Sequence, residues 1–260
     1  MELNIGDKVT RNSHGNDIVF IIVEIEDGVC KLKGVNVRLL VDAEVNDLKK
    51  HNDEDIENEK DFLDRLDTSA DLDRNDYFYL PGKILHIDSD NDYLNRCLDY
   101  YKKINIWAKG INEREDQISN HISQWLEEYK PNIVVITGHD AYYKRSGGKE
   151  DLNAYRSSAV FVEAVRKARE YESSHEKLVI FAGACGSCYE ELIKAGANFA
   201  SSPKRINIHA LDPAIVASKM STADINKDID IKNILEKTKY GKDGIGGIIT
   251  RGTMYVGYPR

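Results

Sequence analysis

Ile133-Val134-Val135-Ile136-Thr137-Gly138-His139-Asp140 and Leu178-Val179-Ile180-Phe181-Ala182-Gly183-Ala184-Cys185 share one pattern. In each, a run of apolar residues stops at a glycine and then presents a reactive side chain. Such a continuous apolar run predicts a strand buried on both faces of a parallel sheet. Open α/β sheets bind ligands beyond the carboxyl ends of their strands. We therefore expect His139 and Cys185 to share one crevice.

Strands alternate with helices throughout residues 79–260. We expect strands at 83–87, 104–108, 133–137 and 178–181, with short strand candidates at 199–201 and 206–209. Helices are expected at 91–102, 113–128, 153–172, 188–195, 213–220 and 229–236. This alternation predicts an α/β fold with a doubly wound, mainly parallel sheet. The glycine-rich segment 241–252 predicts a hairpin at the edge of that sheet.

The first 78 residues have a different composition. Residues 1–48 contain short Val- and Ile-rich runs separated by turn residues, which predicts a small SH3-like β-barrel domain. Its role is open between a docking module and a brace on the main domain. Residues 49–78 are dense in charge and thin in large apolar residues, which predicts a charged linker.

The composition excludes several classes of function. The net charge is -8 and the pI is about 5.5, which disfavours nucleic acid and anionic membranes as partners. No apolar run approaches the roughly 20 residues of a membrane helix, and no secretory signal opens the chain. We therefore expect a cytoplasmic protein whose four cysteines are free thiols. We expect no cofactor, because the glycine-rich segment matches neither a P-loop nor a dinucleotide-binding motif.

Cys185 and His139 are the candidate catalytic residues. Cys185 lies between a strand and a helix expected to begin near Cys188, where backbone N–H groups and the helix dipole favour a thiolate. His139 follows the neighbouring strand and is placed to act as its general base. A buried structural cysteine is the competing interpretation of Cys185 alone. The two residues together predict a cysteine peptidase.

Two other chemistries fit the same residues. Cys185-Gly186-Ser187-Cys188 is a C-x-x-C motif before a helix, as in thiol-disulfide oxidoreductases, but that interpretation leaves His139 unexplained. His139, Cys185 and Cys188 would also supply three ligands to a zinc ion. A closed structural site needs a fourth ligand, although three ligands and a water would serve catalysis. Our prediction is that the site holds no metal.

Motifs along nearly the whole chain resemble the YabG family of sporulation-specific peptidases of spore-forming Firmicutes. The matching segments are Gly6-Asp7-Lys8-Val9-Thr10-Arg11, Leu32-Lys33-Gly34-Val35-Asn36-Val37-Arg38-Leu39, Pro81-Gly82-Lys83-Ile84-Leu85-His86-Ile87-Asp88, Ile136-Thr137-Gly138-His139-Asp140-Ala141, Phe181-Ala182-Gly183-Ala184-Cys185, Gly196-Ala197-Asn198-Phe199-Ala200-Ser201-Ser202-Pro203 and Arg205-Ile206-Asn207-Ile208-His209-Ala210-Leu211-Asp212-Pro213. The order of strand-end His and strand-end Cys also resembles caspase- and gingipain-type peptidases, which implies a caspase-like fold.

The resemblance implies a function and assigns roles. It implies an endopeptidase that cleaves after basic residues and processes spore coat and related proteins, with Cys185 as nucleophile and His139 as its partner. Such a protein would reside in the cytoplasm of the sporulating cell or with the spore coat. We also hypothesise self-cleavage, in the linker or within Lys144-Arg145-Ser146-Gly147-Gly148.

Five further residues are candidates for the oxyanion hole or for substrate binding. A glycine commonly follows the histidine in the caspase-type group, whereas Asp140 follows it here. We expect the N–H groups of Asp140 and Cys185 to bind the oxyanion. A substrate guanidinium requires a carboxylate partner. The candidates, including the neighbouring glycines, are Asp140, Gly138, Gly186, Asp88 and Asp212.

Overall fold

The computed structural model describes residues 3–51 and 76–259 of the 260-residue chain. The chain divides into two compact units, Met1–Asp67 and Thr68–Arg260. Most of the expected linker, residues 49–78, lies outside the described residues. Within the described ranges, no helix is both long and apolar enough to cross a membrane.

The first unit is a five-stranded antiparallel sheet with the order β4-β3-β2-β1-β5. Its elements are β1 (Lys8–Arg11), η1 (Asn12–His14), β2 (Phe20–Glu26), β3 (Val29–Gly34), β4 (Leu40–Glu44), η2 (Val45–Asp47) and β5 (Leu48–Lys50). Alternate residues of the strands form its core, among them Val9, Phe20, Ile22 and Leu32. β4 and β5 are the two edge strands, and within the described residues they do not pair with each other. The closed barrel predicted from the sequence is therefore not confirmed.

The second unit is built on a six-stranded sheet with the order β12-β11-β10-β9-β7-β8. Its strands are β7 (Ile84–Asp88), β8 (Ala108–Asn112), β9 (Ile133–Thr137), β10 (Val179–Ala182), β11 (Phe199–Ser201) and β12 (Ile245–Gly247). All neighbouring pairs are parallel except β11 and β12. This confirms the α/β class and the mainly parallel sheet.

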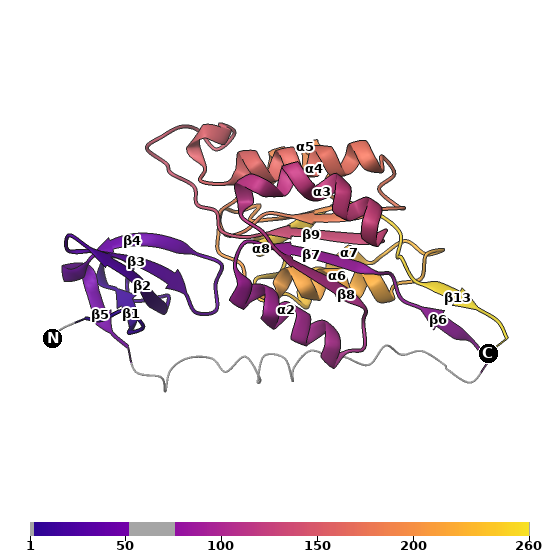
Figure 1. The fold of residues 1–260 in the computed structure, drawn as a ribbon, viewed down its shortest axis with the longest axis horizontal. Helices are drawn as coiled ribbons and strands as arrows, with labels where there is room; N and C mark the ends of the chain where they lie inside the picture. Colours follow the sequence, from indigo (N-terminus) through magenta and orange to yellow (C-terminus); the bar gives the residue numbers. More distant parts are fainter. Residues whose placement is uncertain (1–2, 52–75, 260) are drawn as a thin grey trace. The chain divides into compact units, whose positions relative to one another are not determined.

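Helices cover both faces of this sheet (Figure 1). One face carries α3 (Glu115–Tyr129), α4 (Ser158–Tyr171) and α5 (Tyr189–Ala195). The other carries α2 (Asn91–Lys103), α6 (Asp212–Thr222) and α7 (Ile231–Glu236). The short helices η4 (Leu152–Ala154) and α8 (Gly241–Gly244) and the strand pair β6 (Phe78–Leu80) and β13 (Tyr255–Gly257) complete the unit.

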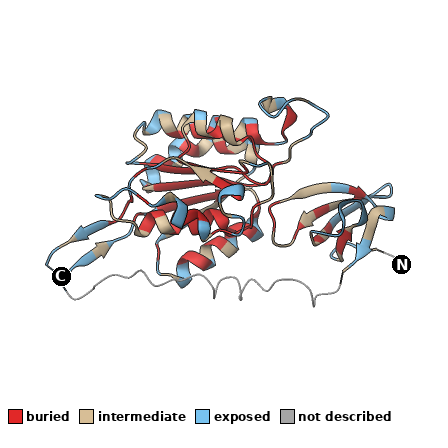
Figure 2. Cartoon of the chain, turned by 180° about the vertical axis from the view of Figure 1, so that it is seen from behind, coloured by how far each residue is buried: buried red, intermediate tan, exposed pale blue. Residues whose placement is uncertain are grey.

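The central strands are buried because they lie between two layers of helices (Figure 2). Every residue of β7, β9 and β10 is buried. The strand order reverses between β7 and β9, because β7 continues to β8 on one side while β9, β10 and β11 follow on the other. In open α/β sheets the ligand crevice lies at the carboxyl ends of the strands at such a reversal.

Four predicted elements differ from the structure. The helix expected at 153–172 begins at Ser158, and residues Leu152–Ala154 form the separate helix η4. The strand expected at 104–108 lies at Ala108–Asn112, because Ile104 and Ile106 donate hydrogen bonds back to α2 and end that helix. Residues 206–209 are outside the named strands of the unit. The expected hairpin at 241–252 is instead α8 followed by β12, which pairs with β11.

Candidate active site

β9 and β10 are neighbouring parallel strands, and their register places the two candidate catalytic residues level with each other. Ile136 pairs with Ala182, and His139 and Cys185 each lie three residues beyond this pair. The N–H of Gly183 donates to Ile136 O at 3.0 Å, which continues the pairing past the strand ends. The prediction that the histidine and the cysteine leave adjacent strands at one sheet edge is therefore confirmed.

His139 is buried, and its ring is held by the turn between β7 and α2. Its Nε2 lies 2.9 Å from Asp90 Oδ2, so the ring donates to a carboxylate. The ring of Tyr93 packs against it with 5.6 Å between centroids. Nδ1 is buried and has no hydrogen-bond partner among the described residues. An imidazole that donates from Nε2 keeps Nδ1 as an acceptor, which is the form that a general base requires.

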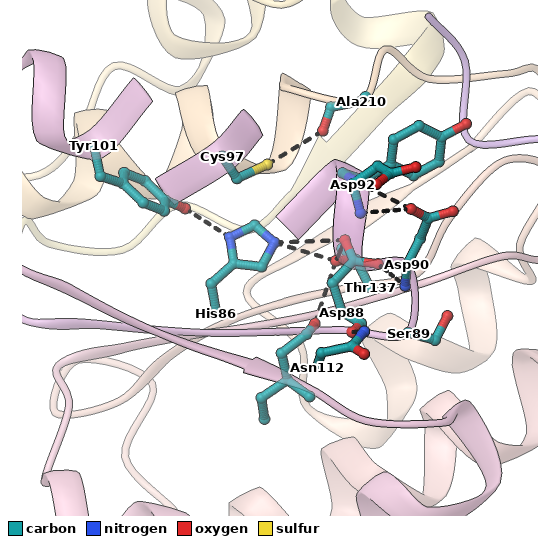
Figure 3. A network of polar contacts seen from close by, with 12 residues as sticks. His86, Asp88, Ser89, Asp90, Asp92, Cys97, Tyr101, Asn112, Thr137 and Ala210 are labelled. Atoms are coloured by element: carbon teal, nitrogen blue, oxygen red, sulfur yellow. Dashed lines mark hydrogen bonds and ion pairs between the residues drawn. The ribbon is translucent and has the colours of Figure 1, made fainter. Parts of the chain in front are cut away.

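Asp90 has two contacts in this turn, and the sequence interpretation predicted neither of them. Its Oδ1 accepts from the N–H groups of Asp92 at 3.0 Å and Tyr93 at 3.2 Å, which caps α2 (Figure 3). Its other oxygen is the one that faces His139. The available signal was an aspartate between a buried strand and a helix, at the sheet edge where the histidine was expected.

A network of buried polar side chains around Asp88 supports the position of Asp90 (Figure 3). Asp88 accepts the N–H of Asp90 at 2.9 Å and the hydroxyl of Thr137 at 2.7 Å. The Oγ1 of Thr137 lies 3.3 Å from Nε2 of His86, whose Nδ1 lies 2.9 Å from the hydroxyl of Tyr101. Because the Thr137 hydroxyl donates its proton to the carboxylate, Nε2 of His86 is the donor in its contact with Thr137.

Cys185 is fully buried in the turn after β10. Its Sγ lies 3.3 Å from the backbone N and 3.6 Å from the backbone O of Ile208. The N–H donor favours the thiolate, whereas full burial and the S–H donation to Ile208 O favour the neutral thiol. α5 begins at Tyr189, with Cys188 as its N-cap, close to the start expected from the sequence.

Two glycines shape the turn that carries the sulfur. Gly183 has a φ of +100°, and a side chain there would meet Ser201 Oγ at 2.5 Å. Gly186 has a φ of +70°, and its N–H donates to Ser202 Oγ at 2.8 Å. Left-handed backbone conformations favour glycine. The N–H of Gly186, a candidate donor to the oxyanion, therefore binds the segment after β11.

Asp140 is almost fully buried and binds four hydrogen-bond donors. Oδ1 accepts from the N–H groups of Ala141 at 2.9 Å and Ser157 at 2.8 Å. Oδ2 accepts from the hydroxyls of Ser158 at 2.5 Å and Ser187 at 2.7 Å. Burial raises the pKa of the Asp140 carboxyl, and the hydrogen bonds to the ionised form oppose that shift. Its carboxylate thus joins the loop after β9 to the turn after β10, while Asp90 contacts the imidazole.

The remaining candidates lie around these turns. Asp212 is buried at the start of α6, where its carboxylate accepts from the N–H groups of His209 at 2.8 Å and Lys239 at 2.9 Å. A side chain at Gly138 would meet Ser89 Oγ at 2.5 Å, so the backbone there approaches the turn after β7 closely.

Cys188 has surroundings of its own. Its Sγ lies 3.4 Å from Lys149 O, and burial raises the pKa of its thiol. In the part of the chain that the structure describes, no three His, Cys, Asp or Glu side chains gather to hold a metal ion. The zinc interpretation of His139, Cys185 and Cys188 therefore gains no support.

Comparisons with known proteins place the chain in a family. A family model described as YabG peptidase U57 matches residues 4–72 and 63–259. The Sporulation-specific protease YabG of Bacillus subtilis (strain 168) is 42% identical over 288 residues, covering 100% of this chain and 99% of the relative. A solved structure titled a probable two-component system response regulator/GGDEF domain protein is 18% identical and covers 45% of this chain and 40% of its own, with a TM-score of 0.30. A likeness that low shows no shared activity. The two sequence matches span the whole chain, which therefore belongs to the YabG peptidase family and is a peptidase of sporulation.

Proposed function

We propose that this peptidase is a cysteine endopeptidase with Cys185 as nucleophile and His139 as general base. The supporting observation is the level placement of both residues at the ends of neighbouring strands, with Nε2 of the histidine on a carboxylate. A histidine after the third strand of the sheet and a cysteine after the fourth also support the caspase-like arrangement. A nucleophile, its base and a carboxylate that orients the base form the usual constellation of covalent catalysis.

The reaction follows from these positions. Nδ1 of His139 has no hydrogen-bond partner among the described residues, so the proposal requires a shift of the two turns that brings Sγ of Cys185 to this atom. Nδ1 then takes the proton of the thiol, and the sulfur attacks the carbonyl carbon of the scissile bond. The N–H of Asp140, which has no acceptor among the described residues, stabilises the oxyanion together with the N–H of Cys185. The imidazolium then protonates the leaving amine. Water hydrolyses the thioester, with the imidazole as base, and restores the thiol.

We further propose cleavage after Arg or Lys, with Asp212 as the carboxylate that binds the basic side chain. The side chain before the scissile bond lies next to the attacked carbonyl, and therefore next to the sulfur. Asp212 lies four residues beyond Ile208, whose backbone contacts Sγ. The Asp212 carboxylate accepts the N–H groups of His209 and Lys239, whereas the Asp140 carboxylate accepts four hydrogen bonds. We propose spore coat proteins and related proteins as substrates, in the sporulating cell or at the spore coat.

Steady-state hydrolysis of peptides with a single Arg or Lys tests the proposal. We expect Cys185→Ala to abolish turnover and His139→Ala to lower kcat at least about 100-fold. Cys188→Ala and His121→Ala are matched controls that keep full activity, because His121 lies on α3 and Cys188 has no role in hydrolysis. Undiminished turnover in Cys185→Ala or His139→Ala would remove that residue from the mechanism, and loss in Cys188→Ala would favour dithiol chemistry. Asp212→Asn should reduce kcat/KM for Arg peptides but not for matched Leu peptides.

Self-cleavage is part of the same proposal. Lys144 and Arg145 are exposed in the loop between β9 and α4, where basic residues are open to attack. Intact mass spectrometry of the wild type and Cys185→Ala tests this, since identical masses after incubation would contradict it.

A further inference from the structure

We propose that the Asp140 carboxylate is a positioning group that locks the turn of the nucleophile to the loop of the histidine. This inference rests on the proposed function, because it assigns a role toward Cys185 to a side chain that touches neither sulfur nor imidazole. Its four donors come from three segments: its own loop, the start of α4 and the turn after β10. One carboxylate therefore connects three parts of the chain at the sheet edge.

The two serine hydroxyls carry the connection to the backbone on both sides of the nucleophile. Ser187 Oγ accepts the N–H of Ala184 at 2.9 Å, and Ser158 Oγ accepts the N–H of Cys188 at 2.8 Å. Ala184 and Cys188 bracket Cys185 in the sequence. The backbone of the turn is thus held both before and after the residue that attacks the substrate.

The charge of the carboxylate fixes the direction of these bonds. An ionised carboxylate only accepts, so each serine must give its proton to Asp140 and present a lone pair to a backbone N–H. Such charge-assisted hydrogen bonds are shorter and stronger than neutral ones. A neutral side chain of the same shape would let the hydroxyls turn and leave the two N–H groups without a fixed acceptor.

Asp140 also supplies the N–H that we assign to the oxyanion. A shift of this side chain would therefore move an oxyanion donor and the sulfur at the same time. The loop and the turn also pack closely, since a Cβ at Gly186 would lie 3.5 Å from the backbone N of Tyr142. Because both of these groups act on the scissile bond, we expect substitution of Asp140 to lower kcat, while substrate binding stays nearly unchanged.

The test uses Asp140→Asn, Ser187→Ala and the double variant in the full chain. Asp140→Asn keeps an oxygen for the two N–H donors and places an amide group toward the serines. Asp151→Asn is the control, because Asp151 lies in the same loop and its carboxylate accepts hydrogen bonds from the backbone N–H and the side-chain amide of Asn153. Turnover is counted per active site, titrated with a peptide chloromethyl ketone, so that misfolded protein does not contribute.

We expect each single variant to lower kcat about tenfold to 100-fold, with KM changed less than about threefold. The double variant should lose no more than the worse single variant, because both remove the same connection. Asp151→Asn should match the wild type. The proposal is overturned if kcat per active site is unchanged in Asp140→Asn and Ser187→Ala, or if their losses multiply. If Cys185→Ala keeps activity, the proposed function itself is wrong, which is a distinct result.

Discussion

Two aspartates flank the candidate histidine, and their surroundings differ in kind. Asp90 lies in the turn after β7 and directs one oxygen to a titratable ring. Asp140 lies in the loop after β9 and binds backbone N–H groups and serine hydroxyls. Asp90 is therefore placed to affect a proton, whereas Asp140 is placed to affect the geometry of the backbone. A buried carboxylate that neighbours a candidate catalytic residue in the sequence therefore need not be its partner in the fold.

Of the substitutions that distinguish the surroundings of Asp90 from those of Asp140, we expect Asp90→Asn to have the largest effect on kcat. The Asn side chain keeps Oδ1 as the cap of α2, but its amide group cannot accept the proton of Nε2. We expect kcat to fall about 100-fold or more, because the imidazole loses the partner that orients it. Steady-state kinetics and a thermal melt measure the two consequences separately.

The control for this variant is Asp116→Asn in the first turn of α3. Asp116 is exposed and pairs with Arg114, so its substitution should leave kcat unchanged. If Asp90→Asn retains wild-type kcat while Asp140→Asn does not, Asp90 does not orient the imidazole as we propose.

A smaller effect should distinguish the two cysteines of the turn. Burial raises the pKa of Cys188 above its ordinary value of 9.0. Below that value the thiol is protonated in both folded and unfolded chains, so its contribution to stability is complete and constant. As the pH rises further, the unfolded thiol ionises first, and the contribution is lost as the pH passes the raised pKa.

We therefore expect the difference in unfolding free energy between the wild type and Cys188→Ala to be flat from about pH 6 to about pH 8. Above about pH 9 it should shrink, because the unfolded thiol ionises before the folded one. Urea unfolding at each pH measures this. If the difference in unfolding free energy already changes near neutral pH, Cys188 ionises there. Cys185 would then not be distinguished from Cys188 by its ionisation.

The sequence predicted the parts of the fold that depend on local patterns. The apolar runs of β9 and β10 correctly indicated buried parallel strands, and with them the shared edge of His139 and Cys185. The strand predicted at 104–108 lies instead at Ala108–Asn112. Ile104 and Ile106 are residue types typical of strands, but their N–H groups bond to the end of α2. Apolar composition alone does not distinguish these two uses.

The contacts that complete the candidate site were beyond sequence reasoning. Asp90 meets His139 across 49 residues, and Asp140 meets Ser187 across 47. Each aspartate also has a plausible local role as a cap or turn residue, which satisfies the sequence pattern without the distant partner. Only the register of neighbouring strands brings these pairs together.

Thiolate formation at Cys185 tests the central claim, that the histidine and the cysteine act as a pair. The measurement is the ultraviolet absorbance of the thiolate against pH, taken as the difference between each protein and its Cys185→Ala counterpart. The wild type should show the thiolate signal at neutral pH, and His139→Ala should show it only in the alkaline range of an ordinary thiol, about 8.5. Identical titration curves in the two backgrounds would contradict the pairing.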